Sequence, residues 1–306
     1  MNSTPYRGRS NVSGALALDP DHFAVADDET NALGIYLRGD REASQAPLAL
    51  SEIFAGEIRD GKRQELDLEG AARIGDVYFW IGSHSTNSEG KHRPARRCLF
   101  GMHLTEAKPG KFSTTRHGSV YRHLIADLKR DLRYAAYHFD LAETIAPKEI
   151  GGLSIEGLAA TPEQGLLIGF RNPLAGGCVE NGRLVGGKTL LAPLLNPLEV
   201  LQGHAAEFEA PIELDLGGHG IRDIAWRQDR EYLIVAGPYH ANVDRLEQHR
   251  LFLWNSASGE FEYLEHIDLG ELNIEAAFFF PDRTDRVELL TDDGEKKGFR
   301  CVSVEL

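Results

Sequence analysis

A short motif recurs five times along this chain, and this repetition restricts the possible folds more than any other feature. Each copy is a short apolar run headed by an acidic or small polar residue, then a polar turn, then a second apolar run. The heads are Ser13, Glu69, Glu156, Asp223 and Glu275. Short apolar runs bounded by turn residues predict β-strands. The chain is therefore expected to repeat one small antiparallel unit.

The spacing of the copies favours a β-propeller. A third apolar run follows each pair, and a fourth often follows that, which matches the four antiparallel strands of a propeller blade. The heads lie 56, 87, 67 and 52 residues apart, and a blade needs about 40–50 residues plus insertions. We expect an all-β fold, a single propeller domain over residues 1–306 with five blades. A sixth, degenerate blade in the 87-residue gap is the alternative.

The same long gap contains a helical pattern. Val120, Leu124, Leu128 and Leu132 fall on one helical face, with Ile125 beside it. This pattern predicts an amphipathic helix near residues 119–135, within a helical insertion over residues 117–146. Such a helix would cap the ring or bind a partner.

The two ends of the chain are expected to meet. The last copy ends at its third strand, FRCVSVEL, so the segment before Ser13 would supply the missing fourth strand. Closing the ring in this way removes exposed sheet edges, which otherwise promote aggregation.

Charge and composition exclude some classes of function. The formal net charge is -14, which disfavours nucleic acid because phosphate contacts need clustered Lys and Arg. No apolar stretch is long enough for a signal peptide or a membrane helix. The three cysteines are far apart and form no CxxC motif. We expect a cytoplasmic protein that binds neither nucleic acid nor membrane.

The acidic heads are expected to converge. The head of a blade's first strand lies beside the tail of its second strand, so heads and tails share one end of the ring. Four carboxylates around a narrow channel must take up protons, pair with Arg or share a cation. Glu69, Glu156, Asp223 and Glu275 are therefore candidate ligands for Ca²⁺, with Mg²⁺ or Mn²⁺ as alternatives. Otherwise each head caps backbone N–H groups of a neighbouring blade.

The strand tails add candidate catalytic residues. His84 and His240 occupy equivalent tail positions and could act as general acid and base, or be ordinary loop histidines. Arg171 faces the acidic heads. It would either pair with Glu69 or Glu156, or bind an anionic group of the substrate.

One basic run follows the second tail. It spans residues 91–97, KHRPARR, and begins near the same rim. Lys91 and Arg93, together with Asn87 and Asn172, are the candidate substrate-binding residues. A solvated loop facing an acidic surface is the alternative.

The repeated EG heads and the run GSHSTNSEGKHRPARRCLFGMHL resemble a bacterial propeller family catalogued as domain of unknown function 3616. The EG strands are also distantly similar to esterase-like phytase propellers. That second resemblance implies a Ca²⁺-dependent phosphoesterase, with Glu69, Glu156, Asp223 and Glu275 as residues on the channel face.

Three functions remain open from the sequence. The first is a metal-dependent hydrolase that cleaves a phosphoester at the channel mouth, where the cation activates a bound water; a metal-dependent lactonase or esterase is a close variant. The second is a non-catalytic platform that recruits a protein partner. The third is a sensor that binds a small anion without chemistry.

Overall fold

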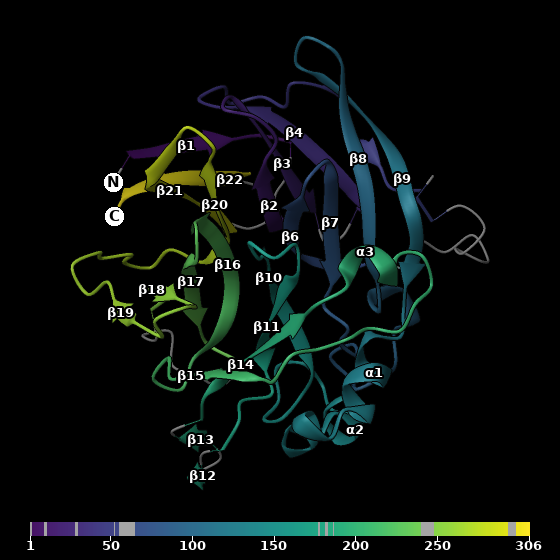
Figure 1. Ribbon diagram of the computed structural model, residues 1–306. Helices are drawn as coiled ribbons and strands as arrows, with labels where there is room; N and C mark the ends of the chain where they lie inside the picture. The colour runs from purple at the N-terminus through teal and green to yellow at the C-terminus, as the bar shows by residue number, and fades with distance from the viewer. Residues whose placement is uncertain are drawn as a thin grey trace.

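Antiparallel strands arranged in a ring make up most of the molecule (Figure 1). The computed structural model describes residues 2–8, 11–27, 30–51, 53–54, 65–176, 178–180, 183–185, 187–239, 248–292 and 298–306. Within these ranges the strands form five four-stranded sheets and one two-stranded hairpin. The predicted β-propeller with five blades is therefore confirmed.

The innermost strand of each blade is named first here. The first blade contains β2 (Val12–Ala17), β3 (His22–Asp27), β4 (Ala32–Leu37) and β5 (Leu48–Ala49). The second contains β6 (Leu68–Ile74), β7 (Val77–Gly82), β8 (Leu99–Lys108) and β9 (Lys111–Tyr121). The third contains β10 (Ser154–Ala160), β11 (Leu166–Asn172), β14 (Thr189–Leu194) and β15 (Ile212–Leu214). The fourth contains β16 (Gly220–Gln228), β17 (Glu231–Gly237), β18 (Arg250–Asn255) and β19 (Phe261–Tyr263). The fifth contains β20 (Ile274–Phe280), β21 (Arg283–Asp292), β22 (Phe299–Glu305) and β1 (Asn2–Tyr6).

The ends of the chain close the ring, as predicted. β1 pairs antiparallel with β22, with Tyr6 opposite Phe299. In Figure 1 the purple first strand lies beside the yellow last strands. The Tyr6 and Phe299 rings stack with centroids 5.1 Å apart. Hydrogen bonding and apolar burial together therefore join the first residues to the last blade.

Neighbouring inner strands approach closely where the motif places glycine. A Cβ on Gly70 would lie 2.8 Å from the Leu158 Cβ, and one on Gly157 would lie 2.8 Å from the Ile224 Cγ1. These distances are too short for any side chain, so the EG heads need glycine where two blades meet.

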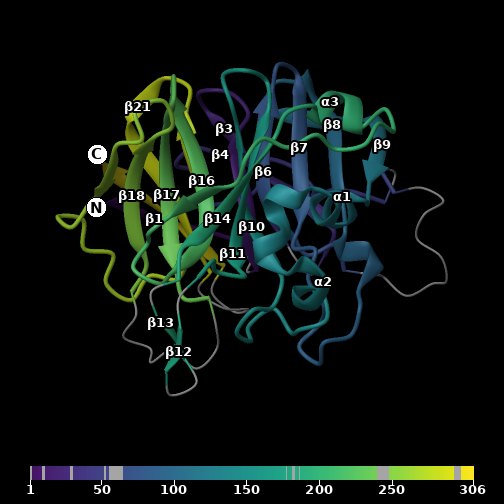
Figure 2. The same ribbon diagram turned by 60° about the horizontal axis from the view of Figure 1, so that its bottom comes forward.

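The helical insertion lies outside the ring, between the second and third blades (Figures 1 and 2). It consists of α1 (Leu124–Arg130), the 3₁₀ helix η2 (Leu132–Tyr137) and α2 (Phe139–Ala142). The helix is shorter than the expected 119–135 because β9 continues to Tyr121, which pairs with Leu99. Three short elements complete the fold: η1 (Pro94–Arg96), α3 (Pro197–Val200) and the hairpin of β12 (Cys178–Glu180) and β13 (Arg183–Val185). None of the helices in the described ranges is long and apolar enough to cross a membrane.

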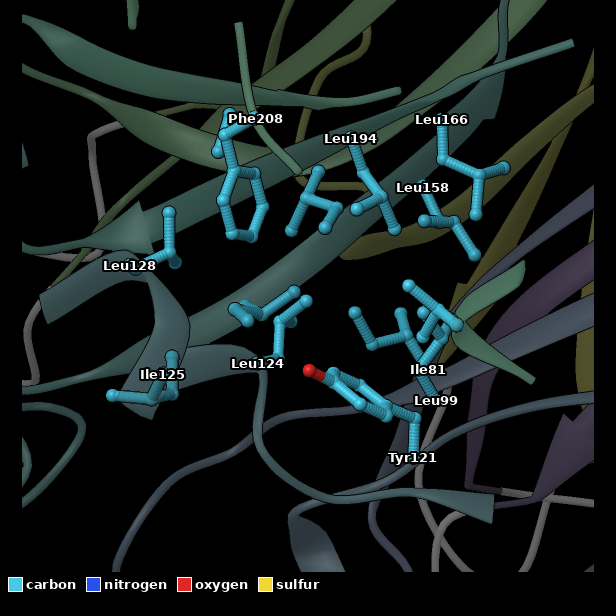
Figure 3. Close-up of a cluster of buried hydrophobic side chains, with 14 of the residues drawn as sticks. Ile81, Leu99, Tyr121, Leu124, Ile125, Leu128, Leu158, Leu166, Leu194 and Phe208 are labelled. Atoms are coloured by element: carbon cyan, nitrogen blue, oxygen red, sulfur yellow. The ribbon is translucent and has the colours of Figure 1, made fainter. Parts of the chain in front are cut away.

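The insertion shares a core with the two blades beside it. Figure 3 shows Leu124, Leu128 and Tyr121 facing Leu158 and Leu194 across this core. Leu124 and Leu128 are fully buried. Leu124, Ile125 and Leu128 of the predicted apolar face therefore fill the wedge between two blades, as a cap on the side of the ring. Leu132, predicted for the same face, is 87% exposed because α1 ends at Arg130.

Candidate functional site

Four inner strands carry a β-bulge at the same place. The pairing skips one residue between Leu68 and Gly70, Ile155 and Gly157, Ile221 and Asp223, and Ile274 and Ala276. The skipped residues are Glu69, Glu156, Arg222 and Glu275. In β2 the irregularity spans Val12 to Ala15 and includes Ser13. Because a bulge re-aims the side chain of its extra residue, these five side chains line one mouth of the channel.

Asp223 is not part of this set, which corrects the sequence alignment of the fourth repeat by one residue. The bulge places Arg222, not Asp223, at the position equivalent to Glu69 and Glu156. Asp223 is buried, and its carboxylate accepts hydrogen bonds from the Ile224 N–H at 2.8 Å and the Ala277 N–H at 2.7 Å. Asp223 therefore caps backbone N–H groups, and one of them belongs to the neighbouring blade. This is the second role that the sequence analysis allowed for the acidic heads.

The mouth opens into a cavity of about 800 Å³, a size typical of small-molecule sites. It is strongly polar. The charged residues that line it are Glu65, Asp67, Glu69, Arg93, Arg96, Lys148, Glu149, Glu156, Arg171, Arg222, Glu275 and Asp292. The propeller thus brings charged groups from several blades around one space.

Two arginines hold Glu156 as a carboxylate. The Arg171 Nη1 lies 2.8 Å from the Glu156 Oε1, and the Arg222 Nη1 lies 2.9 Å from the Oε2. Arg222 also contacts Glu275 through its second terminal nitrogen, Nη2. Burial raises the pKa of Glu156, but the two guanidinium groups outweigh it and leave that pKa below its usual value. The prediction that Arg171 pairs with Glu156 is borne out by this geometry.

Glu69 is in the opposite situation. Its carboxyl has no hydrogen bond or ion pair with any residue in the described part of the chain. Partial burial raises its pKa well above the usual value, and the nearby carboxylates of Asp67, Glu156 and Glu275 raise it further, against a lowering effect from Arg222. Glu69 and Glu156 are thus neighbouring carboxyls whose surroundings favour opposite charge states.

A second polar cluster extends from Glu69 into the wall of the second blade. Asp67 accepts hydrogen bonds from Ser83 and lies 2.8 Å from the Arg96 Nη1. Arg96 also pairs with Glu65 at 2.6 Å. Asp67, Arg96 and Arg222 were not predicted as site residues from the sequence. Asp67 precedes β6 and has a left-handed backbone with φ 52°, so strand periodicity does not predict which way its side chain faces.

The predicted catalytic histidine His84 does not line the cavity. His84 is completely buried, and burial together with Arg97 lowers its pKa to about 3. It is therefore a neutral residue inside the wall. His240 lies outside the described residues.

The four predicted substrate-binding residues are in three different situations. Arg93 and Asn87 both line the cavity. Lys91 does not; it is exposed and pairs with Glu89 at 2.6 Å. Asn172 is buried below the rim, where its amide donates to the Pro147 carbonyl at 3.2 Å and the Glu149 carbonyl at 2.6 Å. It holds the loop that carries Lys148, a cavity residue that the sequence analysis missed.

The metal ligands predicted from the sequence do not form one cluster. Within the described ranges, no group of three or more His, Cys, Asp or Glu residues is arranged to hold a metal ion. Glu156 and Glu275 contact arginine, and Asp223 contacts backbone. Ca²⁺, Mg²⁺ or Mn²⁺ binding at this mouth remains a prediction.

Solved structures with a similar chain path have very different descriptions. A thermostable family-43 glycoside hydrolase matches with a TM-score of 0.48 and 10% identity, covering 100% of this chain and 93% of that one. A Myxococcus xanthus glutaminyl cyclase matches with a TM-score of 0.43 and 12% identity, covering 100% and 96%. YCF48 from Cyanidioschyzon merolae matches with a TM-score of 0.37 and 13% identity, covering 98% and 97%. At these values we draw no functional conclusion from them.

Family membership rests on the sequence. No curated protein matches the chain. The profile of the family described as "Protein of unknown function (DUF3616)" matches residues 11–98 and 102–298, which include the inner strands of all five blades. The similarity to phytase propellers is not among these matches and stays a prediction. The match to the profile covers most of the chain, and the chain belongs to this family.

Proposed function

We propose that the channel mouth is the active site of a hydrolase that acts on a small anionic molecule by acid–base chemistry. The observation that carries the proposal is the pair formed by Glu69 and Glu156. One carboxyl, half-buried in the cavity wall, has no hydrogen bond or ion pair among the described residues, and the other is held by two arginines. Two neighbouring carboxyls in opposite charge states are the usual arrangement for an acid and a base.

The roles follow from the two environments. Glu69, in its protonated form, donates a proton to the leaving oxygen of the substrate. Glu156, in its charged form, accepts a hydrogen bond from the attacking water and takes the proton that this water loses. The bond between the substrate's electrophilic atom and the leaving oxygen breaks as the water oxygen forms its bond. Arg171 and Arg222 keep Glu156 in place throughout.

Cationic side chains at the rim of the cavity are suited to an anionic substrate. Arg93 and Lys148 line the cavity and have no ion pair within the described residues, whereas Arg96, Arg171 and Arg222 all contact carboxylates. Their two loops lie side by side, because the Thr86 hydroxyl donates to the Ile145 carbonyl at 3.0 Å. A pair of free cations at the entrance attracts a phosphate or carboxylate group.

A phosphoester is the more specific substrate that we propose, since a phosphate offers several oxygens to these two cations. The metal-dependent form predicted from the sequence would add a divalent cation beside Glu69, a carboxyl with no ion pair among the described residues. A lactone or carboxylic ester that bears an anionic group fits the same rim.

The test is a hydrolysis screen with matched variants. The full chain is assayed against chromogenic phosphate monoesters, carboxylic esters and lactones, each with a chelator and with added Ca²⁺, Mg²⁺ or Mn²⁺. Glu69→Gln should lower kcat/KM by about 10²-fold or more, the contribution of a general acid. Glu262→Gln, at an exposed carboxylate on β19, should leave it unchanged.

The possible results separate the candidate functions. Activity that Glu69→Gln removes in the presence of chelator supports acid–base chemistry without a metal. Activity that appears only with a divalent cation supports the metal-dependent form. Turnover that Glu69→Gln does not affect overturns the proposal. Saturable binding of phosphate without any turnover favours the anion sensor.

A further inference from the structure

Two histidines on the second blade face each other outside the channel cavity. The His117 Nδ1 lies 3.0 Å from the His103 Nε2. The rings are nearly perpendicular, with centroids 4.9 Å apart and an interplanar angle of 78°. Neither residue lines the cavity at the channel mouth, so the pair is independent of the function proposed above.

The strand register explains why the side chains meet. Gly101 lies opposite His117, and His103 lies opposite Thr115, in the ladder between β8 and β9. His103 and His117 are therefore diagonal neighbours on one face of the sheet, within reach of each other's rings.

Asp76 fixes the orientation of the first ring. The His103 Nδ1 lies 3.1 Å from the Asp76 backbone carbonyl and 3.4 Å from its carboxylate. Both partners are acceptors, so Nδ1 carries the proton and the Nε2 lone pair is directed toward His117. A histidine whose far nitrogen donates to a carboxylate or carbonyl is the usual form of a metal-ligating imidazole.

We propose that His103 and His117 form a surface site for a divalent transition-metal ion of the Zn²⁺, Ni²⁺ or Cu²⁺ class. Two nitrogens at about 2.0–2.1 Å from a tetrahedral Zn²⁺ lie roughly 3.3 Å apart, close to the separation found here. The His103 side chain is 30% exposed, so the ion reaches it from solvent. The site has two protein ligands, consistent with the absence of any larger ligand group in the described ranges, and water fills the other positions.

Titration of the untagged full chain tests this site. Zn²⁺, Ni²⁺ and Cu²⁺ are each titrated by calorimetry in a buffer that does not bind metal. We expect one ion per chain, with the tightest binding for Cu²⁺. His103→Gln and His117→Gln should each weaken binding by about tenfold or more, whereas His266→Gln, an exposed histidine on another blade, should not change it. Circular dichroism verifies that each variant is folded.

Two further results make the test specific. Asp76→Asn should weaken binding by about tenfold without abolishing it, as expected for an outer-shell carboxylate. The electron paramagnetic resonance spectrum of bound Cu²⁺ should show coupling to imidazole nitrogen that disappears in both histidine variants. No binding at about 1 mM metal, or equal binding and unchanged spectra in both variants, would overturn the proposal and leave only a hydrogen bond between two histidines.

Discussion

Arg222 is the residue on which the charge balance of the channel mouth depends. It is buried, and it contacts both Glu156 and Glu275. Arg222→Met leaves these carboxylates without their shared partner, and breaking a buried ion pair on one side costs about 3–5 kcal/mol. Urea denaturation should show a decrease of this size in the free energy of unfolding.

The matched control is an arginine in an exposed pair. Arg230 contacts Glu163, and both side chains are about half exposed. Arg230→Met should change the free energy of unfolding by less than about 1 kcal/mol, because solvent screens such pairs. Equal effects of the two substitutions would mean that the network at the mouth does not stabilise the fold.

The sequence predicted three of the channel-facing heads correctly and placed the fourth one residue too far along. Glu69, Glu156 and Glu275 are bulge residues that line the cavity. In the fourth repeat the acidic residue follows the bulge, so a search for carboxylates selected Asp223 and overlooked Arg222. Strand periodicity cannot locate a bulge, since one inserted residue reverses which side chains face the channel.

At the scale of elements, the insertion depends on α1. Leu128 is completely buried in the core shared with two blades, whereas Leu132 is 87% exposed. Leu128→Ala should lower the free energy of unfolding by about 2–5 kcal/mol. Leu132→Ala should change it by about 0.5 kcal/mol or less. Thermal denaturation of the two variants would contradict the assignment if both lost the same stability.

Leu128 and Leu132 also show how much of a helix the sequence periodicity predicts. The pattern identified the helical region and its buried face at Leu124, Ile125 and Leu128. It could not locate the ends, because they depend on contacts distant in the sequence. At one end, strand pairing holds Tyr121 opposite Leu99. At the other, the Asp131 side chain accepts a hydrogen bond from the Arg133 N–H and begins a new 3₁₀ turn.

At the scale of the whole molecule, ring closure depends on β1. Tyr6 is buried between Phe299 and Tyr36, with ring centroids 5.1 and 5.4 Å away. Tyr6→Ala should lower the free energy of unfolding by about 3–5 kcal/mol, as for other large aromatic truncations. Ser3→Ala, at an exposed position of the same strand, should change it by about 0.5 kcal/mol or less. A mild effect of Tyr6→Ala would mean that the ring does not need this strand.

Closure of the ring brings five inner strands together and places the half-buried Glu69 at the channel mouth. The central claim concerns the protonation state of this carboxyl. Its folded-state pKa is raised by burial and by neighbouring carboxylates. The stability associated with its protonated form is therefore present below its unfolded pKa, about 4.3, and is lost as the pH rises toward the folded value. Glutamine at this position does not titrate.

The most direct measurement is thermal denaturation of the wild-type chain and Glu69→Gln between about pH 4 and pH 8. The Tm of Glu69→Gln should be close to that of the wild type near pH 4 and should exceed it increasingly toward pH 8. The gap should widen with pH because only the wild-type side chain ionises over this range. A gap that does not change with pH, or a Glu69→Gln variant that is less stable at neutral pH, would contradict a raised pKa of Glu69 at the channel mouth.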